Sequence, residues 1–305
     1  MDKVYDMIVV GGGPGGYSAA LYAARAGLET VVIEKLCAGG QMALTQQIDN
    51  YPGFPQGIDG FQLGENMRQG AQRFGAETVY AEVTRLQLRD KIKQVHTDSG
   101  VFRGKTVVLA MGADHRSLGL AGEAELVGRG VNYCAACDGM LYRGKTVAVV
   151  GGGNTAVQDA LLLSRVAEKV ILIHRRDTLR ASRVLHDALQ AAKNVEILWN
   201  TKVVEFVHDD LLTGLQLENV NTHRMQTVSA DGVFISVGRN PNTQLVSGTL
   251  NLDASGYILA DETTCTNIPG VFAVGDIRSK AVRQIVTAVS DGAVACHFAE
   301  TYLAE

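Results

Sequence analysis

The stretch Gly11-Gly12-Gly13-Pro14-Gly15-Gly16 decides the fold, because it separates an apolar run at Val4–Val10 from an alanine-rich stretch that extends to Ala26. Three of its glycines occupy the G-x-G-x-x-G positions of a dinucleotide-binding turn, namely Gly11, Gly13 and Gly16. The first permits a tight bend, the second lets the backbone approach a pyrophosphate, and the third lets the helix pack on the strand. The pattern predicts a strand, a turn and a helix, with a second strand at Thr30–Glu34.

The same order recurs 140 positions later. A strand-like run at Thr146–Val150 precedes Gly151-Gly152-Gly153-Asn154-Thr155-Ala156, and a helical stretch at Val157–Ala167 leads to a strand at Lys169–His174. Here the three loop positions are Gly151, Gly153 and Ala156, and alanine is a tolerated variant at the third. The repeat predicts two nucleotide sites of βαβ type in one chain.

The residue that ends the second strand differs between the two repeats. Glu34 ends it in the first, where a carboxylate accepts hydrogen bonds from ribose hydroxyls. His174 stands at the matching position of the second repeat, followed by Arg175 and Arg176, with Arg180 further on. A carboxylate would repel a 2′-phosphate, whereas guanidinium groups bind it in a fork geometry. The second site is therefore predicted to bind NADPH and not NADH.

Two of the five cysteines are closely spaced, in Cys134-Ala135-Ala136-Cys137-Asp138. Structural zinc would need two more ligands at suitable spacing, and the sequence has no second pair, so we expect no metal site. A buried, inert pair and a redox dithiol remain, and the two nucleotide sites favour the dithiol. Asp138, next to the second thiol, is a candidate proton donor and acceptor, or alternatively a turn residue.

Composition narrows the class of protein. The chain has 305 residues, 46% hydrophobic and 20% charged, and a formal net charge of −4, which argues against nucleic acid as a main partner. No apolar run reaches the roughly 18 residues that span a bilayer. The start, Met1 to Tyr5, leads directly into a strand-like run and does not look like a signal peptide. A cytoplasmic location without membrane attachment is expected.

Together, these motifs resemble those of the low-molecular-weight, bacterial-type thioredoxin reductases. The resemblance spans residues 4–303 and extends to Gly39-Gly40-Gln41, Asn50-Tyr51-Pro52-Gly53, Gly275-Asp276 and Arg283-Gln284. It implies a homodimer that binds FAD and NADPH and reduces a thioredoxin or thioredoxin-like protein. It also implies an FAD site formed by the first glycine loop with Glu34, Gln41, Asn50, Asp276 and Gln284.

The expected fold class is α/β, with two Rossmann-like, three-layer nucleotide-binding domains, one inserted into the other. The repeat places the FAD domain at residues 1–115 and 243–305, and the NADPH domain, which carries Cys134 and Cys137, at residues 116–242. Further strands are expected at Thr78–Leu88, Gln94–Thr97, Thr106–Ala110, Val195–Val207, Leu215–Val220 and Gly232–Val237. Helices are expected near Phe61–Phe74 and from Gln284 to Leu303.

The predicted function is an NADPH-dependent flavoprotein disulfide reductase, in which electrons pass from NADPH through FAD to Cys134–Cys137 and then to thioredoxin. One alternative is an NADPH-dependent reductase or oxidase of another small disulfide on the same scaffold. A ferredoxin- or flavodoxin-linked reductase is disfavoured by the Arg175–Arg176 pair and by Cys134–Cys137. The last alternative is a flavin-bearing redox sensor without catalytic activity, which NADPH would not bleach.

Overall fold

A computed structural model describes residues 3–45 and 47–305. Met1 and Asp2, which belong to the start that does not look like a signal peptide, lie outside the described residues. The chain divides into two compact units. Unit 1 is Met1–Asp114 with Asn240–Glu305, and unit 2 is His115–Arg239. The segments that connect them contain β7 (Ala113–His115) and β16 (Arg239–Pro241), which pair with each other. None of the described helices has the length and apolar character needed to cross a membrane.

The main sheet of unit 1 has strand order β3-β2-β1-β6-β5-β4, and β17 pairs with β6. Parallel pairing joins β3, β2, β1, β6 and β17, whereas β4 and β5 are antiparallel additions. The strands are β1 (Val4–Val10), β2 (Thr30–Glu34), β3 (Glu77–Tyr80), β4 (Val83–Gln87), β5 (Lys93–Thr97), β6 (Gly100–Leu109) and β17 (Val271–Ala273).

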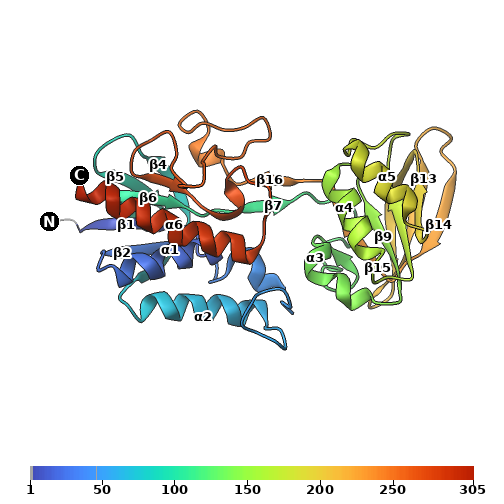
Figure 1. Cartoon of the computed structure of the whole chain (residues 1–305), viewed down its shortest axis with the longest axis horizontal. Coiled ribbons are helices and arrows are strands. Elements are labelled where there is room, and N and C mark those ends of the chain that lie inside the picture. Colours follow the sequence, from blue (N-terminus) through green and yellow to red (C-terminus); the bar gives the residue numbers. More distant parts are fainter. Residues whose placement is uncertain (1–2, 46) are drawn as a thin grey trace. The chain divides into compact units, whose positions relative to one another are not determined.

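Alternate residues of β1 face opposite layers, as the period of a strand requires. Met7 and Val9 pack in the core formed with the helices, while Ile8 and Val10 pack in the core on the other face of the sheet. The helices of unit 1 are α1 (Pro14–Arg25), α2 (Gly60–Gln72) and α6 (Ile285–Ala304). Figure 1 shows α1 and α6 side by side. Gly292 permits this approach, because a Cβ there would lie 2.2 Å from the carbonyl oxygen of Gly15.

Unit 2 has a parallel sheet of order β11-β10-β9-β15-β8, with helices on one face and the antiparallel sheet β12-β13-β14 on the other. Val147 and Val149 of β9 face the helices, and Ala148 and Val150 face the second sheet. The parallel strands are β8 (Val131–Asn132), β9 (Thr146–Val150), β10 (Lys169–Ile173), β11 (Val195–Leu198) and β15 (Gly232–Ile235). The others are β12 (Thr201–His208), β13 (Leu212–Asn219) and β14 (Met225–Ser229), and the helices are α3 (Ala135–Asp138), α4 (Asn154–Leu163) and α5 (Arg183–Ala191).

The α/β class and both βαβ repeats are confirmed, with differences in detail. The expected strand at Thr78–Leu88 is two strands, because β3 pairs with β2 while β4 turns to pair with β5. The helix expected at Val157–Ala167 begins earlier, at Asn154, and ends at Leu163. Neither α5 nor β14 was expected from the sequence. Short 3₁₀ turns occupy Gly40–Leu44, Gly139–Tyr142, Gln244–Val246 and Gly275–Ile277.

Candidate active site

The first glycine loop has the shape of a phosphate cradle. Gly11 has a φ of +102°, and a Cβ at Gly16 would lie 2.0 Å from the carbonyl oxygen of Gly11, so strand and helix approach too closely for a side chain. Gly13, by contrast, has open space where its Cβ would be, with no atom of the described residues within 4 Å. It caps α1, whose N-terminal N–H groups favour an anion. These residues fit a dinucleotide pyrophosphate.

The carboxylate of Glu34 lies against this loop. Its Oε2 accepts a hydrogen bond from the N–H of Gly12 at 2.6 Å, and its Oε1 accepts one from the N–H of Leu36 at 3.0 Å. The side chain remains partly exposed at the end of β2. The structure therefore places the expected ribose acceptor next to the glycine turn, with its orientation fixed by two backbone donors.

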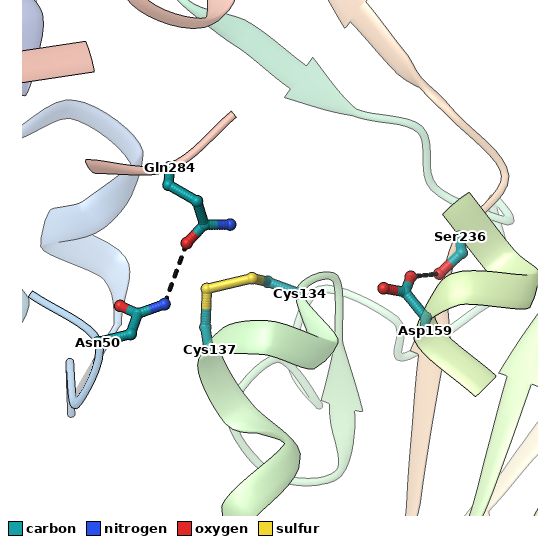
Figure 2. The surroundings of a disulfide bond; sticks show 6 residues. All are labelled: Asn50, Cys134, Cys137, Asp159, Ser236 and Gln284. Carbon is teal, nitrogen blue, oxygen red and sulfur yellow. Dashed lines mark hydrogen bonds between the residues drawn. A yellow bond between two sulfur atoms is a disulfide. The ribbon is translucent and has the colours of Figure 1, made fainter. Parts of the chain in front are cut away.

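Two of the other expected flavin residues meet within unit 1. The side-chain amide of Asn50 donates to Oε1 of Gln284 at 3.0 Å, as Figure 2 shows. Gln284 also caps α6 through a reciprocal capping box with Thr287. Gln41 is held differently, because its Nε2 donates to the carbonyl oxygen of Ala113 at 2.7 Å and to Asp114 at 2.9 Å.

Asp276, the last expected flavin residue, lies in the turn Gly275–Ile277, which a buried carboxylate holds in place. Asp291, inside α6, accepts from the N–H of Gly275 at 2.8 Å and from the side chains of Arg278 and Lys280. No sequence motif predicts this cluster. Its only signal in the sequence is a single acidic residue in the otherwise uncharged first half of the last helix.

The second glycine loop repeats the geometry of the first in unit 2. A Cβ at Gly151 would lie 2.4 Å from the carbonyl oxygen of Ser236, whereas Gly153 is open, with nothing within 4 Å among the described residues. Figure 2 shows Asp159 of α4 accepting a hydrogen bond from the Ser236 hydroxyl, at 2.5 Å. This bond ties α4 to the end of β15. The second loop therefore fits a second pyrophosphate.

The residues after β10 separate into a buried imidazole and exposed guanidinium groups. His174 is buried, its ring lies against Gly152, and its Nε2 makes a 3.0 Å hydrogen bond with the carbonyl oxygen of Thr178. Burial lowers the pKa of His174, so this ring is neutral at pH 7 and shapes the loop without adding charge. Arg175, Arg176 and Arg180 are exposed, and none forms an ion pair within residues 3–45 and 47–305. They present free donors for an anion.

Cys134 and Cys137 form a disulfide, with their Cα atoms 5.3 Å apart. Figure 2 shows Cys134 at the start of the short helix α3 and Cys137 within it. Both side chains are partly exposed. The other three cysteines, Cys37, Cys265 and Cys296, are free thiols, and the buried Cys296 has its pKa raised to about 12 by burial.

Asp138, which ends α3, has the chemistry expected of a proton carrier. Burial raises the pKa of its carboxyl to about 6, close to physiological pH. A group with such a pKa can both donate and accept a proton near neutrality, which breaking or forming a disulfide requires. Unit 2 thus carries an acid, a disulfide and a glycine loop.

Comparison with known proteins agrees with this geometry. The sequence matches the family described as pyridine nucleotide-disulphide oxidoreductase over residues 5–292. A thioredoxin reductase of Treponema pallidum is 42% identical, covering 99% of this chain and 98% of its own. One of Listeria monocytogenes is 43% identical, covering 100% and 95%. The solved thioredoxin reductase of Streptococcus pyogenes has a TM-score of 0.92 and 41% identity, covering 100% and 99%. The chain therefore belongs to the pyridine nucleotide-disulphide oxidoreductase family, and within it to the bacterial-type thioredoxin reductases, which are flavin- and nucleotide-dependent enzymes.

Proposed function

We propose that this protein is an NADPH-dependent, FAD-containing reductase of a thioredoxin or a thioredoxin-like protein. The observation that carries the proposal is the Cys134–Cys137 disulfide at the start of α3, next to an aspartic acid of raised pKa. The names of the relatives, which are thioredoxin reductases, support thioredoxin as the substrate.

FAD is assigned to unit 1 and NADPH to unit 2. Support for FAD comes from the open position at Gly13, from Gly11, Gly16 and Glu34, and from the Asn50–Gln284 pair near the N-terminus of α6. Support for NADPH comes from Gly151, Gly153 and Ala156, followed by arginines without a carboxylate partner at residues 175, 176 and 180. Three arginines favour the 2′-phosphate that distinguishes NADPH from NADH.

The redox step at the cysteines is a balanced two-electron exchange. When bound, FAD would accept the two electrons of a hydride from NADPH and pass them to the disulfide. Reduction breaks the bond between the sulfurs of Cys134 and Cys137, and the two sulfurs take up two protons in all. Asp138, with a pKa of about 6, delivers and removes one of these protons at the sulfur nearest to it.

The dithiol then reduces the partner by thiol–disulfide exchange. The Cys134 thiolate attacks one sulfur of the partner disulfide, and the other partner sulfur leaves as a thiolate. Cys137 next attacks Cys134 in the mixed disulfide, which re-forms the Cys134–Cys137 bond and releases the partner as a dithiol. The assignment of the outer role to Cys134 and of the flavin-facing role to Cys137 rests on the resemblance to this enzyme class.

We further propose that the protein is a cytoplasmic homodimer with no role in binding nucleic acid. Three free cysteines, at 37, 265 and 296, suit a reducing compartment. The formal net charge of −4 gives no general attraction to phosphate backbones.

The testing experiment measures NADPH oxidation by the purified FAD-bound protein. Thioredoxin should accelerate it strongly, while glutathione disulfide, small aromatic disulfides and oxygen should not, and NADH should be a poor donor. Rapid turnover with a small disulfide and none with any thioredoxin would instead identify the alternative activity on this scaffold. Failure of NADPH to bleach the flavin would contradict the whole pathway.

A further inference from the structure

The strand that leads to the disulfide is anchored on both of its faces. Asn132, at the end of β8, donates through Nδ2 to the hydroxyl of Tyr142 at 2.8 Å and to the carbonyl oxygen of Gly130 at 3.1 Å. Tyr133 packs instead in the core between the two sheets of unit 2. Cys134 follows directly, so its backbone starts from a residue whose side chain is fixed.

The hydroxyl of Tyr133 donates a 2.7 Å hydrogen bond to Oε1 of Glu123. Glu123 is only 5% exposed, and it accepts further hydrogen bonds from three consecutive backbone N–H groups, those of Leu118, Gly119 and Leu120, at 2.9, 2.9 and 3.3 Å. Burial, and then the neighbouring carboxylate, raise the pKa of Tyr133, so the phenol keeps its proton and remains a donor. A buried carboxylate therefore links residues 118–120 to the residue before Cys134.

The ring of Tyr133 is held as well as its hydroxyl. The imidazole of His115 stacks on it, with centroids 4.9 Å apart and planes inclined by 21°. His115 ends β7, one of the two segments that connect the units. Tyr133 thus has its ring and its hydroxyl fixed by two different parts of the segment that enters unit 2.

We propose that Glu123 and Tyr133 are positioning residues for Cys134, an inference that rests on the proposed disulfide-reductase function. The anchor holds the Cys134 backbone in the same place whether the two sulfurs are bonded or reduced. It thereby keeps the sulfurs of the dithiol close enough to re-form their bond and aims Cys134 at the partner. Without the anchor, the reduced pair is freer, the disulfide is less favoured and the exchange with the partner is slower.

The direct test is Tyr133→Phe, which keeps the ring, its stacking and its core packing but removes the donor to Glu123. The first readout is the equilibrium of Cys134–Cys137 with glutathione in the FAD-bound protein, in which two glutathione thiols and the disulfide exchange for glutathione disulfide and the dithiol. The variant should shift this equilibrium toward the dithiol, and the net free energy of one such hydrogen bond limits the shift to at most roughly three- to tenfold. The kcat with thioredoxin should fall by a similar factor, with the KM for NADPH unchanged.

A matched control removes the same kind of bond elsewhere. The hydroxyl of Tyr5 in β1 donates to Oε2 of Glu77 at 2.9 Å, in unit 1. Tyr5→Phe should leave the glutathione equilibrium and the kcat unchanged, whatever it does to thermal stability. This separates a role at the cysteines from the general loss of a tyrosine–glutamate hydrogen bond.

Glu123→Gln weakens the same anchor by a second, independent route, because one of the two oxygens that accept these hydrogen bonds becomes an amide NH2 group that cannot accept. It carries the test alone if Tyr133→Phe does not fold. Each single variant should shift the equilibrium, and the double variant should shift it by less than the sum of the two single effects, because both weaken one connected anchor. An unchanged glutathione equilibrium in folded Tyr133→Phe or Glu123→Gln protein, or equal shifts in Tyr5→Phe, would overturn the inference. The equilibrium needs neither nucleotide nor thioredoxin, so failure of the proposed function is seen separately, as wild-type protein that does not reduce thioredoxin.

Discussion

Asp291 and Arg278 form a two-point ion pair inside unit 1, in which Nη2 of Arg278 lies 2.9 Å from Oδ1 of Asp291 and Nε lies 3.0 Å from Oδ2. Lys280 adds a third contact, with Nζ 2.7 Å from Oδ2, and all three side chains are less than a tenth exposed. The same carboxylate accepts the N–H of Gly275. The pair therefore locks the turn that holds Asp276 onto α6.

Asp291→Asn should destabilise the protein by about 3–5 kcal/mol at pH 7, because it leaves two buried cations without their anion. Burial alone would raise the pKa of Asp291, but hydrogen bonds from Arg278 and Lys280 outweigh it and lower this pKa. The stability that Asp291 contributes is therefore present above the unfolded-state pKa of about 3.9 and is lost as pH falls through the lower folded pKa. Urea unfolding at pH 7 and under acidic conditions measures both effects.

A control for this prediction is Glu196→Gln, which breaks the exposed pair with Lys169 and should cost less than about 1 kcal/mol. Equal unfolding midpoints for wild type and Asp291→Asn at pH 7 would show that the buried pair does not stabilise unit 1.

Arg175→Ala or Arg176→Ala should weaken the use of NADPH by roughly ten- to a hundredfold, because each removes a charge-assisted hydrogen bond to the 2′-phosphate. NADH lacks this phosphate, so kcat/KM with NADH should stay nearly constant. Arg165→Ala, which removes another exposed arginine of unit 2, is the control. Equal losses with both nucleotides would contradict the assignment of this cluster.

Gly13→Ala and Gly153→Ala should have reciprocal effects, because each adds a methyl group at an open position of one glycine loop. The first should raise the Kd for FAD by roughly tenfold or more and spare NADPH binding, since the backbone can no longer approach the pyrophosphate. Gly153→Ala should weaken NADPH binding by a similar factor and spare FAD binding. FAD content after purification and NADPH binding by calorimetry measure the two. Loss of FAD in the Gly153 variant alone would reverse the assignment of the loops.

Asp138→Asn should remove a titration near pH 6 from the pH profile of thioredoxin reduction, because burial raises the pKa of Asp138 to about 6. The raised pKa also has a consequence for stability. The protonated carboxyl is favoured in the folded protein, so wild-type stability decreases as pH rises from the unfolded pKa of about 3.9 through the folded value of about 6. The Asn variant should lack that decrease. A pH profile in which the limb near pH 6 persists in Asp138→Asn would exclude Asp138 as the proton carrier.

Cys134→Ser and Cys137→Ser should each retain FAD and a flavin that NADPH reduces, yet lose thioredoxin reduction. Cys134→Ser leaves the thiol proposed to face the flavin, so only this variant should show a long-wavelength charge-transfer absorption band. Spectra and stopped-flow traces of both variants test the division of roles. The reverse pattern, with the band in Cys137→Ser, would exchange the roles of the two cysteines.

The sequence was sufficient for the features that depend on local chemistry. Both glycine loops, the strands that flank them and the C-x-x-C pair are marked by residue types at fixed local spacing. At the first loop the geometry leaves room for glycine only, as the 2.0 Å approach of a Gly16 Cβ to the carbonyl oxygen of Gly11 illustrates. Features that depend on distant partners were not predictable. Only strand pairing divides the segment expected to be one strand into β3 and β4, because β3 pairs with β2 whereas β4 pairs with β5.

The side-chain networks show the same limit. Asp291 meets Arg278 and Lys280 because a turn and a helix pack together, and Glu123 meets Tyr133 across a loop. No motif marks either contact. His174 occupies a motif position, yet the structure places its ring against Gly152, where packing within unit 2 decides its orientation.

Trapping of the cysteines after anaerobic addition of NADPH tests the central claim most directly. The FAD-bound protein is mixed with NADPH, and free thiols are then alkylated with iodoacetamide. After digestion, mass spectrometry measures the mass of the peptide that contains Cys134 and Cys137. We predict that both cysteines become alkylated with NADPH, and that they remain disulfide-bonded without nucleotide or in protein stripped of FAD. A flavin that NADPH bleaches fully while the Cys134–Cys137 disulfide stays intact would contradict the account.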